Sequence, residues 1–147
     1  MAQALAAARA AGARGEIPVG AVIVAPDGSV MASGNRTRRR TDPTAHAELL
    51  VIRAACRAAR CERLPGYDLY VTLEPCAMCA AAISFARIRR LYFGAADAKM
   101  GAVEHGARFF TLPTCHHAPE VYGGLGESEA RALLKTFFSA RRAKGLG

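Results

Sequence analysis

The segment LYVTLEPCAMCAAAISFA, residues 69–86, indicates the fold class of this chain. Its first five residues are apolar, aromatic or β-branched, which is typical of a buried strand. Pro75 then favours the first turn of a helix, and small residues continue to Ala86. A buried strand followed by a helix is typical of layered α/β domains, so we expect a largely buried sheet covered by helices.

Strands and helices alternate on both sides of this segment. Hydrophobic periodicity and turn residues predict helices over residues 1–13, 44–61 and 128–143, and strands over residues 19–24, 30–33 and 90–95 and near residue 121. Residues 35–43 are polar and end in Asp42-Pro43, so we expect a loop there that carries four arginines. In the last helix, Leu134, Phe137 and Phe138 are expected to supply the inner face.

The size and composition of the chain favour one globular domain. The chain has 147 residues, of which 52% are hydrophobic and 22% are charged, so it is too apolar for a disordered protein. The longest nearly uninterrupted apolar stretch, residues 76–86, is far short of the ~20 residues that a membrane-spanning helix needs. We therefore expect a single soluble domain over residues 1–147, with no membrane partner.

Cysteine usage and the first residues bear on the compartment. Five cysteines without a secretory signal favour a reduced compartment, where paired thiols are more often metal ligands or catalysts than disulfides. The Ala- and Arg-rich residues 1–14 lack a continuous apolar core, so we interpret them as a helix and not as a targeting peptide. These features predict a cytoplasmic protein.

The charge of the chain is strongly basic. It carries 20 basic and 12 acidic residues, a formal net charge of +8 and a pI near 9.8, and all but three of the basic residues are arginine. Arginine suits bidentate contact with phosphate and stacking on bases, so this balance favours a polyanionic partner. A solvated basic surface without a partner explains the same composition, so charge alone does not decide the function.

Four residues form a candidate metal and catalytic site. His46 and Glu48 are two positions apart at the start of one predicted helix, and Cys76 and Cys79 are three apart at the start of another. Cysteines at i and i+3 share a helix face, and the free N–H groups of a first turn stabilise thiolates. A Cys-x-x-Cys pair alone is typical of a redox motif, half of a structural zinc site or two buried thiols. The upstream His-x-Glu favours one Zn²⁺ per chain, held by His46, Cys76 and Cys79.

The number of ligands indicates the chemistry. Three protein ligands leave one position for water, which is typical of catalytic zinc, whereas a structural site has four. Two thiolates and a neutral imidazole cancel the charge of the ion, so its water is expected to be less acidic than at an all-histidine site. Glu48 is then expected to act as the base that takes a proton from the water and returns protons to a ring nitrogen and a leaving amine. The predicted reaction is hydrolytic deamination.

Other residues compete for these roles. The cluster Cys115-His116-His117 is the best rival source of a fourth ligand, although its two histidines and His105 are of a type that more often serves as surface or structural residues. Cys56 falls on the apolar stripe of its helix and is expected in the core. Three arginines mark another face of that helix and are expected in solvent: Arg53, Arg57 and Arg60.

The order His46-Ala47-Glu48, then Pro75-Cys76-Ala77-Met78-Cys79, resembles the zinc-dependent nucleotide deaminase superfamily, whose signature and mechanism it matches. Within that superfamily the chain is similar to the bacterial tRNA-specific adenosine deaminases. The matching segments cover nearly the whole chain and are residues 15–22, 34–36, 42–48, 69–79, 87–88, 93–95, 97–101, 137–138 and 141–142.

This resemblance implies a three-layer α/β/α cytidine-deaminase-like fold with a central five-stranded mixed sheet. It also implies a homodimer that binds the anticodon arm and converts the wobble adenosine of an arginine tRNA to inosine, with no DNA substrate. Asn35 matches the family position that hydrogen-bonds the flipped nucleoside, and Asp97 matches one that touches the anticodon loop. Four further residues match positions that line the RNA groove: Lys99, Phe138, Arg141 and Arg142.

Two other functions remain open at this point. A deaminase of a free nucleobase or nucleoside, such as guanine, cytosine or adenosine, uses the same zinc chemistry but has no need for a net charge of +8. A non-catalytic, zinc-stabilised RNA-binding module uses the charge but has no need for Glu48. Release of ammonia from free bases favours the first of these, and RNA binding without formation of inosine favours the second.

Overall fold

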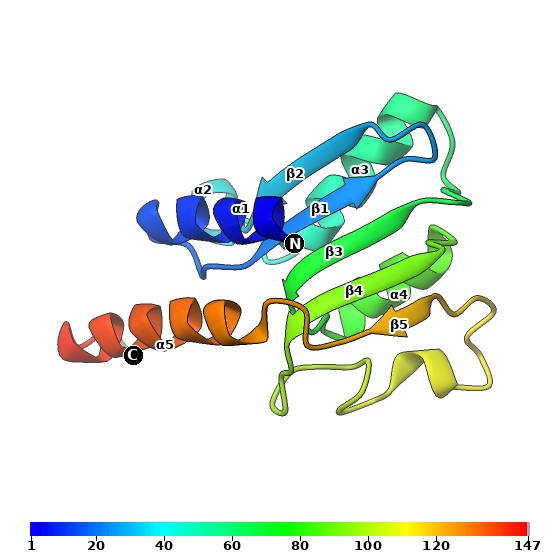
Figure 1. Cartoon of the computed structure of the whole chain (residues 1–147). Coiled ribbons are helices and arrows are strands. Elements are labelled where there is room, and N and C mark those ends of the chain that lie inside the picture. The colour runs from blue at the N-terminus through cyan, green and yellow to red at the C-terminus, as the bar shows by residue number, and fades with distance from the viewer. Residues whose placement is uncertain (147) are drawn as a thin grey trace.

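The computed structural model describes residues 1–146, in which five strands form one mixed sheet (Figure 1). Its elements in chain order are α1 (Ala2–Ala13), β1 (Gly20–Val24), β2 (Val30–Gly34), α2 (Thr37–Arg40), α3 (Ala47–Ala59), β3 (Asp68–Leu73), α4 (Ala77–Phe85), β4 (Arg90–Ala95), a 3-10 helix (Phe109–Thr111), β5 (Glu120–Tyr122) and α5 (Glu127–Ala143). The strand order is β2-β1-β3-β4-β5. Strands β3, β4 and β5 are parallel, and β1 is antiparallel to both of its neighbours.

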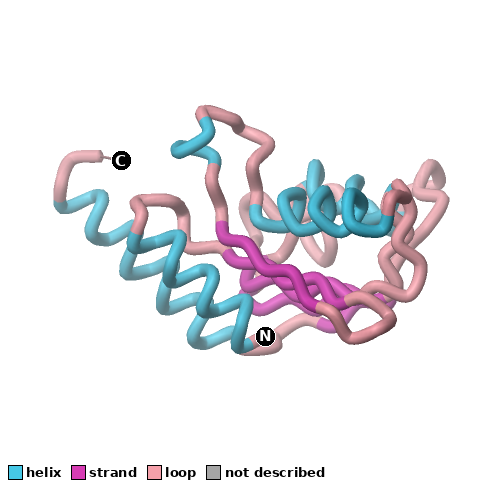
Figure 2. The backbone as a smooth tube through the Cα atoms, turned by 90° about the horizontal axis from the view of Figure 1, so that it is seen from above, coloured by secondary structure: helices cyan, strands magenta, loops and turns pink. Residues whose placement is uncertain are grey.

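The sheet lies between two layers of helices, as Figure 2 shows from above. Helices α1 and α5 contact each other on one face, and α3 and α4 contact each other on the opposite face. This confirms the expected three-layer α/β/α fold with a five-stranded mixed sheet. The single domain was expected to extend to Gly147, which lies outside the described residues.

Strand β3 lies in the middle of the sheet and contributes to the main core. Its residues Leu69 and Val71 are fully buried and pair in register with Leu91 and Phe93 of β4. Together with apolar residues of α3 and α4 they form the main hydrophobic core. Two parallel strands need a crossover connection over one face of the sheet. Helix α4 forms this connection between β3 and β4, and it begins at Ala77, shortly after β3 ends at Leu73.

The arginine-rich segment after β2 is not the loop that the sequence predicts. Residues Thr37–Arg40 form a short helix, α2. The buried carboxylate of Glu16 accepts hydrogen bonds from the backbone N–H groups of Arg38 and Arg39, at 3.2 and 2.8 Å. An acidic group at the N-terminus satisfies N–H groups that a helical turn leaves free. Glu16 is remote in sequence from this turn, so local patterns give no sign of its contribution.

The expectation that Phe137 and Phe138 both lie on the inner face of α5 is wrong for Phe138. Phe138 is 42% exposed, whereas Phe137 is partly buried, so only one ring of the pair faces inward. Ala130 is the buried residue of α5, and the last turns of this helix extend beyond the sheet (Figure 1). None of the helices within residues 1–146 has the length and apolar character needed to cross a membrane.

Candidate metal and catalytic site

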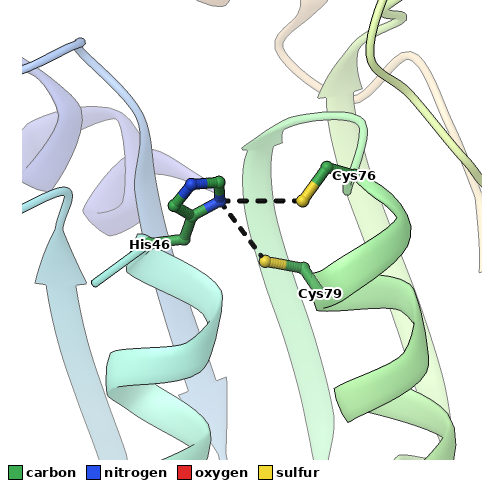
Figure 3. A group of neighbouring side chains, drawn as sticks. All are labelled: His46, Cys76 and Cys79. Atoms are coloured by element: carbon green, nitrogen blue, oxygen red, sulfur yellow. Dashed lines mark hydrogen bonds between the residues drawn. The ribbon is translucent and has the colours of Figure 1, made fainter. Parts of the chain in front are cut away.

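His46, Cys76 and Cys79 meet in space, as the sequence predicts. Figure 3 shows the imidazole at the start of α3 facing the two sulfur atoms at the start of α4. The Nδ1 atom of His46 lies 3.7 Å from the Sγ atom of Cys76 and 3.6 Å from that of Cys79. All three ligand atoms lie within 4.8 Å of one another, and Cys79 is buried.

These distances fit a zinc ion. Zinc in proteins is tetrahedral, with Zn–S bonds of about 2.3 Å and Zn–N bonds of about 2.0–2.1 Å, which separates a nitrogen from a sulfur ligand by about 3.6 Å. The two N–S separations of the cluster match this value. Two thiol groups and one imidazole are also the donor types that zinc prefers. The arrangement therefore fits zinc with three protein ligands, and no fourth histidine, cysteine or carboxylate joins the group among residues 1–146.

The surroundings of Cys76 favour ionisation of its thiol, whereas those of Cys79 oppose it. Cys76 is the N-cap residue of α4, and Cys79 lies in its first turn. A hydrogen bond from Cys79 lowers the pKa of Cys76 to about 4, and one with His46 adds to this effect. The same contact with Cys76, together with burial, raises the pKa of Cys79. A thiolate at the start of a helix is stabilised by the helix dipole, so one metal ligand is ionised at neutral pH.

Glu48 lies in the first turn of α3, two residues after His46, and is 4% exposed. Burial raises the pKa of Glu48 to about 7, although the charge of His46 opposes this shift. Its Oε2 atom is buried and has no hydrogen-bond partner among the described residues. A carboxyl group with a pKa near neutrality, beside three metal ligands, has the property that a general acid and base requires.

Asn35 also lies beside this site. It is 6% exposed, and its Oδ1 atom accepts a hydrogen bond at 2.9 Å from the backbone N–H of Ala47, between His46 and Glu48. This bond satisfies one N–H group at the N-terminus of α3 and fixes the side-chain amide of Asn35 at the site. The proximity agrees with the substrate contact that the sequence predicts for Asn35, and that contact remains a prediction.

The loop after β4 carries Asp97 and Lys99 and reaches Cys76 at Gly101. Gly101 in this loop pairs with Cys76 in an isolated antiparallel bridge. The Oδ1 atom of Asp97 accepts hydrogen bonds from the backbone N–H groups of Lys99 and Met100, both at 3.0 Å. The loop therefore lies beside the metal cluster, with Lys99 exposed at its tip.

Glu74 holds this loop, a role that its sequence context does not predict. Its side chain is fully buried, and its two carboxylate oxygens accept hydrogen bonds from backbone N–H groups of four residues: Asp97, Val103, Glu104 and His105. Although burial raises its pKa, these donors outweigh that effect and leave the pKa of Glu74 lowered. The position of Glu74 directly after a buried strand is the one local sign of a special role. The residues that donate to its carboxylate lie more than twenty positions away in sequence, so local sequence does not identify them.

The C-terminal residues predicted to bind RNA lie on a different part of the molecule. Phe138, Arg141 and Arg142 belong to α5, which packs against α1, β3 and β4 and, within the described residues, not against α3 or α4. The guanidinium of Arg141 lies 5.7 Å from the ring centre of Phe137. The structure therefore does not bring these residues to the metal cluster.

The rival ligands make structural contacts. The Nε2 atom of His117 lies 2.7 Å from the backbone oxygen of Ile88, and the hydroxyl of buried Ser84 donates to the backbone oxygen of His117 at 2.6 Å. Cys115 lies 3.5 Å from the same hydroxyl. His105 contacts Glu74. These contacts anchor the segment between β4 and β5, and none of these residues joins the His46 cluster.

Comparison with known proteins identifies the family. Residues 1–95 match the cytidine and deoxycytidylate deaminase zinc-binding region. The chain belongs to this deaminase family. The deaminase is 67% identical over 140 residues to the tRNA-specific adenosine deaminase of Agrobacterium fabrum, a match that covers 95% of this chain and 91% of that protein.

Two solved structures extend the comparison. One comes from a study of A-to-I editing by tRNA:A34 deaminases and superposes on the deaminase with a TM-score of 0.89, at 67% identity, covering 91% of this chain and 97% of that one. A guanine deaminase from Nitrosomonas europaea superposes with a TM-score of 0.79 at 23% identity, over 94% of this chain and 82% of that one. The second match shows the shared fold alone, and both agree with the cytidine-deaminase-like architecture.

Proposed function

We propose that this deaminase hydrolyses the wobble adenosine of a tRNA anticodon, in an arginine tRNA, to inosine and ammonia. The observation that carries the proposal is 67% identity, over 95% of the chain, to a tRNA-specific adenosine deaminase. The net charge of +8 supports an RNA substrate, because a free base offers no phosphate for it to contact.

His46, Cys76 and Cys79 are the proposed ligands of one zinc ion per chain. Their N–S separations of 3.6 and 3.7 Å and their donor types support this assignment. When bound, zinc supplies Lewis-acid chemistry that makes water a stronger nucleophile at neutral pH.

Glu48 is the proposed proton carrier. Its raised pKa allows the carboxylate to accept a proton from the attacking water and then to donate protons to the purine ring nitrogen and to the departing amino group. In the balanced reaction, water adds to C6 across the C6–N1 double bond of adenosine, and the bond from C6 to the amino nitrogen then breaks. A carbonyl forms at C6 and ammonia leaves. Because Glu48 is buried, bulk water has little access to the carboxyl group during these transfers.

Asn35 and the loop of Asp97 and Lys99 are the proposed contacts around the flipped nucleoside. Asn35 is already fixed by its bond to Ala47, so its remaining amide N–H groups can donate to the substrate with little loss of freedom. Phe138, Arg141 and Arg142 are proposed to bind a more distant part of the anticodon arm, since they lie on α5. An exposed aromatic ring beside guanidinium groups suits stacking and phosphate contact.

The proposal extends to the oligomeric state and the cellular location of the enzyme. We propose that residues 1–147 act as one deaminase domain, in a cytoplasmic homodimer that does not use DNA. Two apolar side chains are largely exposed, Phe85 at 74% and Met100 at 70%, which supports their burial in a dimer. Light scattering of the purified protein at micromolar concentration tests this, and a monomer mass contradicts it.

One assay tests the proposed reaction. The zinc-loaded enzyme is incubated with a synthetic anticodon stem-loop and, separately, with free adenosine and free guanine. We expect inosine in the stem-loop and no ammonia from the free compounds. Release of ammonia from a free base that is unaffected by added stem-loop contradicts the proposal and favours a nucleobase deaminase. Tight binding of the stem-loop without inosine favours a non-catalytic RNA-binding protein.

A further inference from the structure

A cavity lined by arginines lies between β2 and α3. Strand β2 is an edge strand of the sheet, and α3 packs behind it (Figure 1). Its volume is about 200 Å³. We call this cavity the arginine pocket, after the four side chains that line it: Arg36, Arg40, Arg53 and Arg57. The lining also includes three apolar residues: Met31, Leu50 and Val51. Apolar walls lower the local dielectric constant, which strengthens the attraction between the guanidinium groups and an anion inside the cavity.

The charge of the arginine pocket is not compensated. No acidic residue lines it, and its four guanidinium groups take part in no ion pair or side-chain hydrogen bond within residues 1–146. Asp42 is close enough for Arg53 and Arg40 to help lower its pKa, but the main cause of that shift is Thr44. The Oδ1 atom of Asp42 accepts two hydrogen bonds from Thr44, at 2.8 and 2.7 Å. Four like charges around one small cavity repel one another until an anion binds among them.

The side chain of Arg36 gives independent evidence that a hydrogen-bond acceptor binds here. Its Nε atom is buried and has no hydrogen-bond acceptor among the described residues. Buried N–H groups in proteins are nearly always paired, so an acceptor from a ligand is the natural partner for this one. The backbone of Arg36 is fixed, because its N–H donates to the oxygen of Ala45 at 3.0 Å, directly before His46. The backbone that carries this unpaired group is therefore anchored next to a metal ligand.

We propose that the arginine pocket binds a phosphate group, namely a phosphodiester of the same RNA strand that presents its adenosine to Glu48. This inference rests on the proposed function. Guanidinium groups match phosphate oxygens in bidentate geometry, and the cavity exceeds the size of one phosphate group. Arg36 directly follows Asn35, so a phosphate in the pocket ties the RNA backbone to the segment that holds the flipped nucleoside. The source of the phosphate is the RNA, and free inorganic phosphate is the alternative that the test distinguishes.

Helix α3 offers a matched control. The helical periodicity predicts Arg53, Arg57 and Arg60 together in solvent, but Arg60 does not line the pocket. Arg60 is the C-cap residue with a φ of 52°, and glutamine there keeps the same backbone geometry while removing the charge. The variants Arg53→Gln/Arg57→Gln and Arg60→Gln therefore separate loss of the pocket from loss of positive charge on this helix.

The first experiment measures kcat and KM for deamination of the stem-loop at several KCl concentrations, with thermal unfolding as a check of folding. For Arg53→Gln/Arg57→Gln we expect KM to rise about 100-fold, from about tenfold for each charged hydrogen-bonding group lost, while kcat stays within about twofold. The slope of log KM against log salt should fall by about 0.7, the value for one phosphate of a single strand. Arg60→Gln should change KM by less than about twofold. Equal effects of the double variant and Arg60→Gln overturn the proposal.

The second experiment needs no RNA and no turnover. Thermal stability of the three proteins is measured with inorganic phosphate against chloride at constant ionic strength. Phosphate should stabilise wild type and Arg60→Gln but not the double variant. If wild type forms no inosine while this pattern holds, the proposed function fails and the anion site stands. If the pattern holds while the RNA kinetics of the double variant are normal, the site binds free phosphate and the assignment to RNA is overturned.

Discussion

The backbone N–H of His105 donates to the carboxylate of Glu74 at 3.0 Å, and the Nδ1 atom of the same histidine lies 2.8 Å from that carboxylate. Two residues 31 positions apart are thus joined at two points. Since Glu74 also accepts from Asp97, it links the end of β3, next to the metal ligands, to the loop that carries Lys99. A single buried carboxylate fixes the geometry of one wall of the site.

Glu74→Gln is expected to destabilise the protein by about 2–4 kcal/mol, because several charge-assisted hydrogen bonds lose their charge and an amide N–H₂ faces backbone donors. We expect KM for the stem-loop to rise more than kcat falls, with zinc content unchanged, since the ligands themselves are intact. Glu104→Gln, an exposed residue of the same loop, serves as the control. Thermal unfolding and steady-state kinetics check this, and an unchanged melting temperature in Glu74→Gln contradicts the assigned role.

Glu48→Gln tests the proton carrier. We expect kcat to fall by about 10²- to 10⁴-fold, the usual contribution of general acid–base catalysis, while zinc content stays near one per chain. Glutamine has nearly the same shape, so binding of the stem-loop should be retained. Inosine formation in single-turnover conditions and metal analysis are the measurements. A variant with more than about a tenth of wild-type activity rejects the role of Glu48.

Without metal, the difference in stability between Glu48→Gln and wild type is expected to depend on pH. Burial raises the pKa of Glu48 from 4.5 to about 7, so its ionisation opposes folding. This cost is absent below about pH 4.5, grows between pH 4.5 and 7, and reaches about 3 kcal/mol above pH 7. Chelated Glu48→Gln should therefore gain stability over chelated wild type as the pH rises through this window. Thermal unfolding at pH 5 and pH 8 measures it, and a constant difference between the two proteins contradicts the shift.

Local sequence was sufficient to find the metal cluster, but not the residues that hold its surroundings. His46, Cys76 and Cys79 are each placed by a helix start, and helix starts leave signals within a few residues of themselves. Glu74 and Glu16 act on backbone N–H groups that are far away in sequence, so no local pattern reports their partners. Which oxygen accepts from which N–H is decided by the packing of the whole chain.

The contacts of the arginines of α3 also cannot be predicted from local sequence alone. Periodicity placed Arg53, Arg57 and Arg60 on a polar face, and they are all exposed residues. Only the position of β2 along that face separates the two that line the arginine pocket from the one that does not. Likewise, Phe137 and Phe138 are equivalent as neighbours in sequence, but only Phe137 is partly buried in the structure.

Removal of a zinc ligand is expected to abolish metal binding. In Cys76→Ala and Cys79→Ala two ligands remain, and we expect zinc content to fall well below 0.1 per chain, with loss of activity. Cys115→Ala is the control for the rival ligand, and it should keep stoichiometric zinc because Cys115 contacts Ser84 and the backbone of His117. Metal analysis after dialysis decides between them. Full zinc in Cys79→Ala, or loss of zinc in Cys115→Ala, contradicts the assignment.

The two phenylalanines of α5 give a paired test of RNA contact. Their rings meet edge to face, with centres 5.4 Å apart, but Phe138 is 42% exposed whereas Phe137 is partly buried under Arg141. Phe138→Ala should raise KM for the stem-loop about tenfold through loss of a stacking surface, with a stability change under about 0.5 kcal/mol. Phe137→Ala should instead lower stability by about 1–2 kcal/mol, because it loses the cation–π contact, the aromatic pair and packing. Thermal unfolding and stem-loop kinetics of both variants separate the two roles. If Phe138→Ala leaves KM unchanged, the outer face of α5 does not contact the RNA.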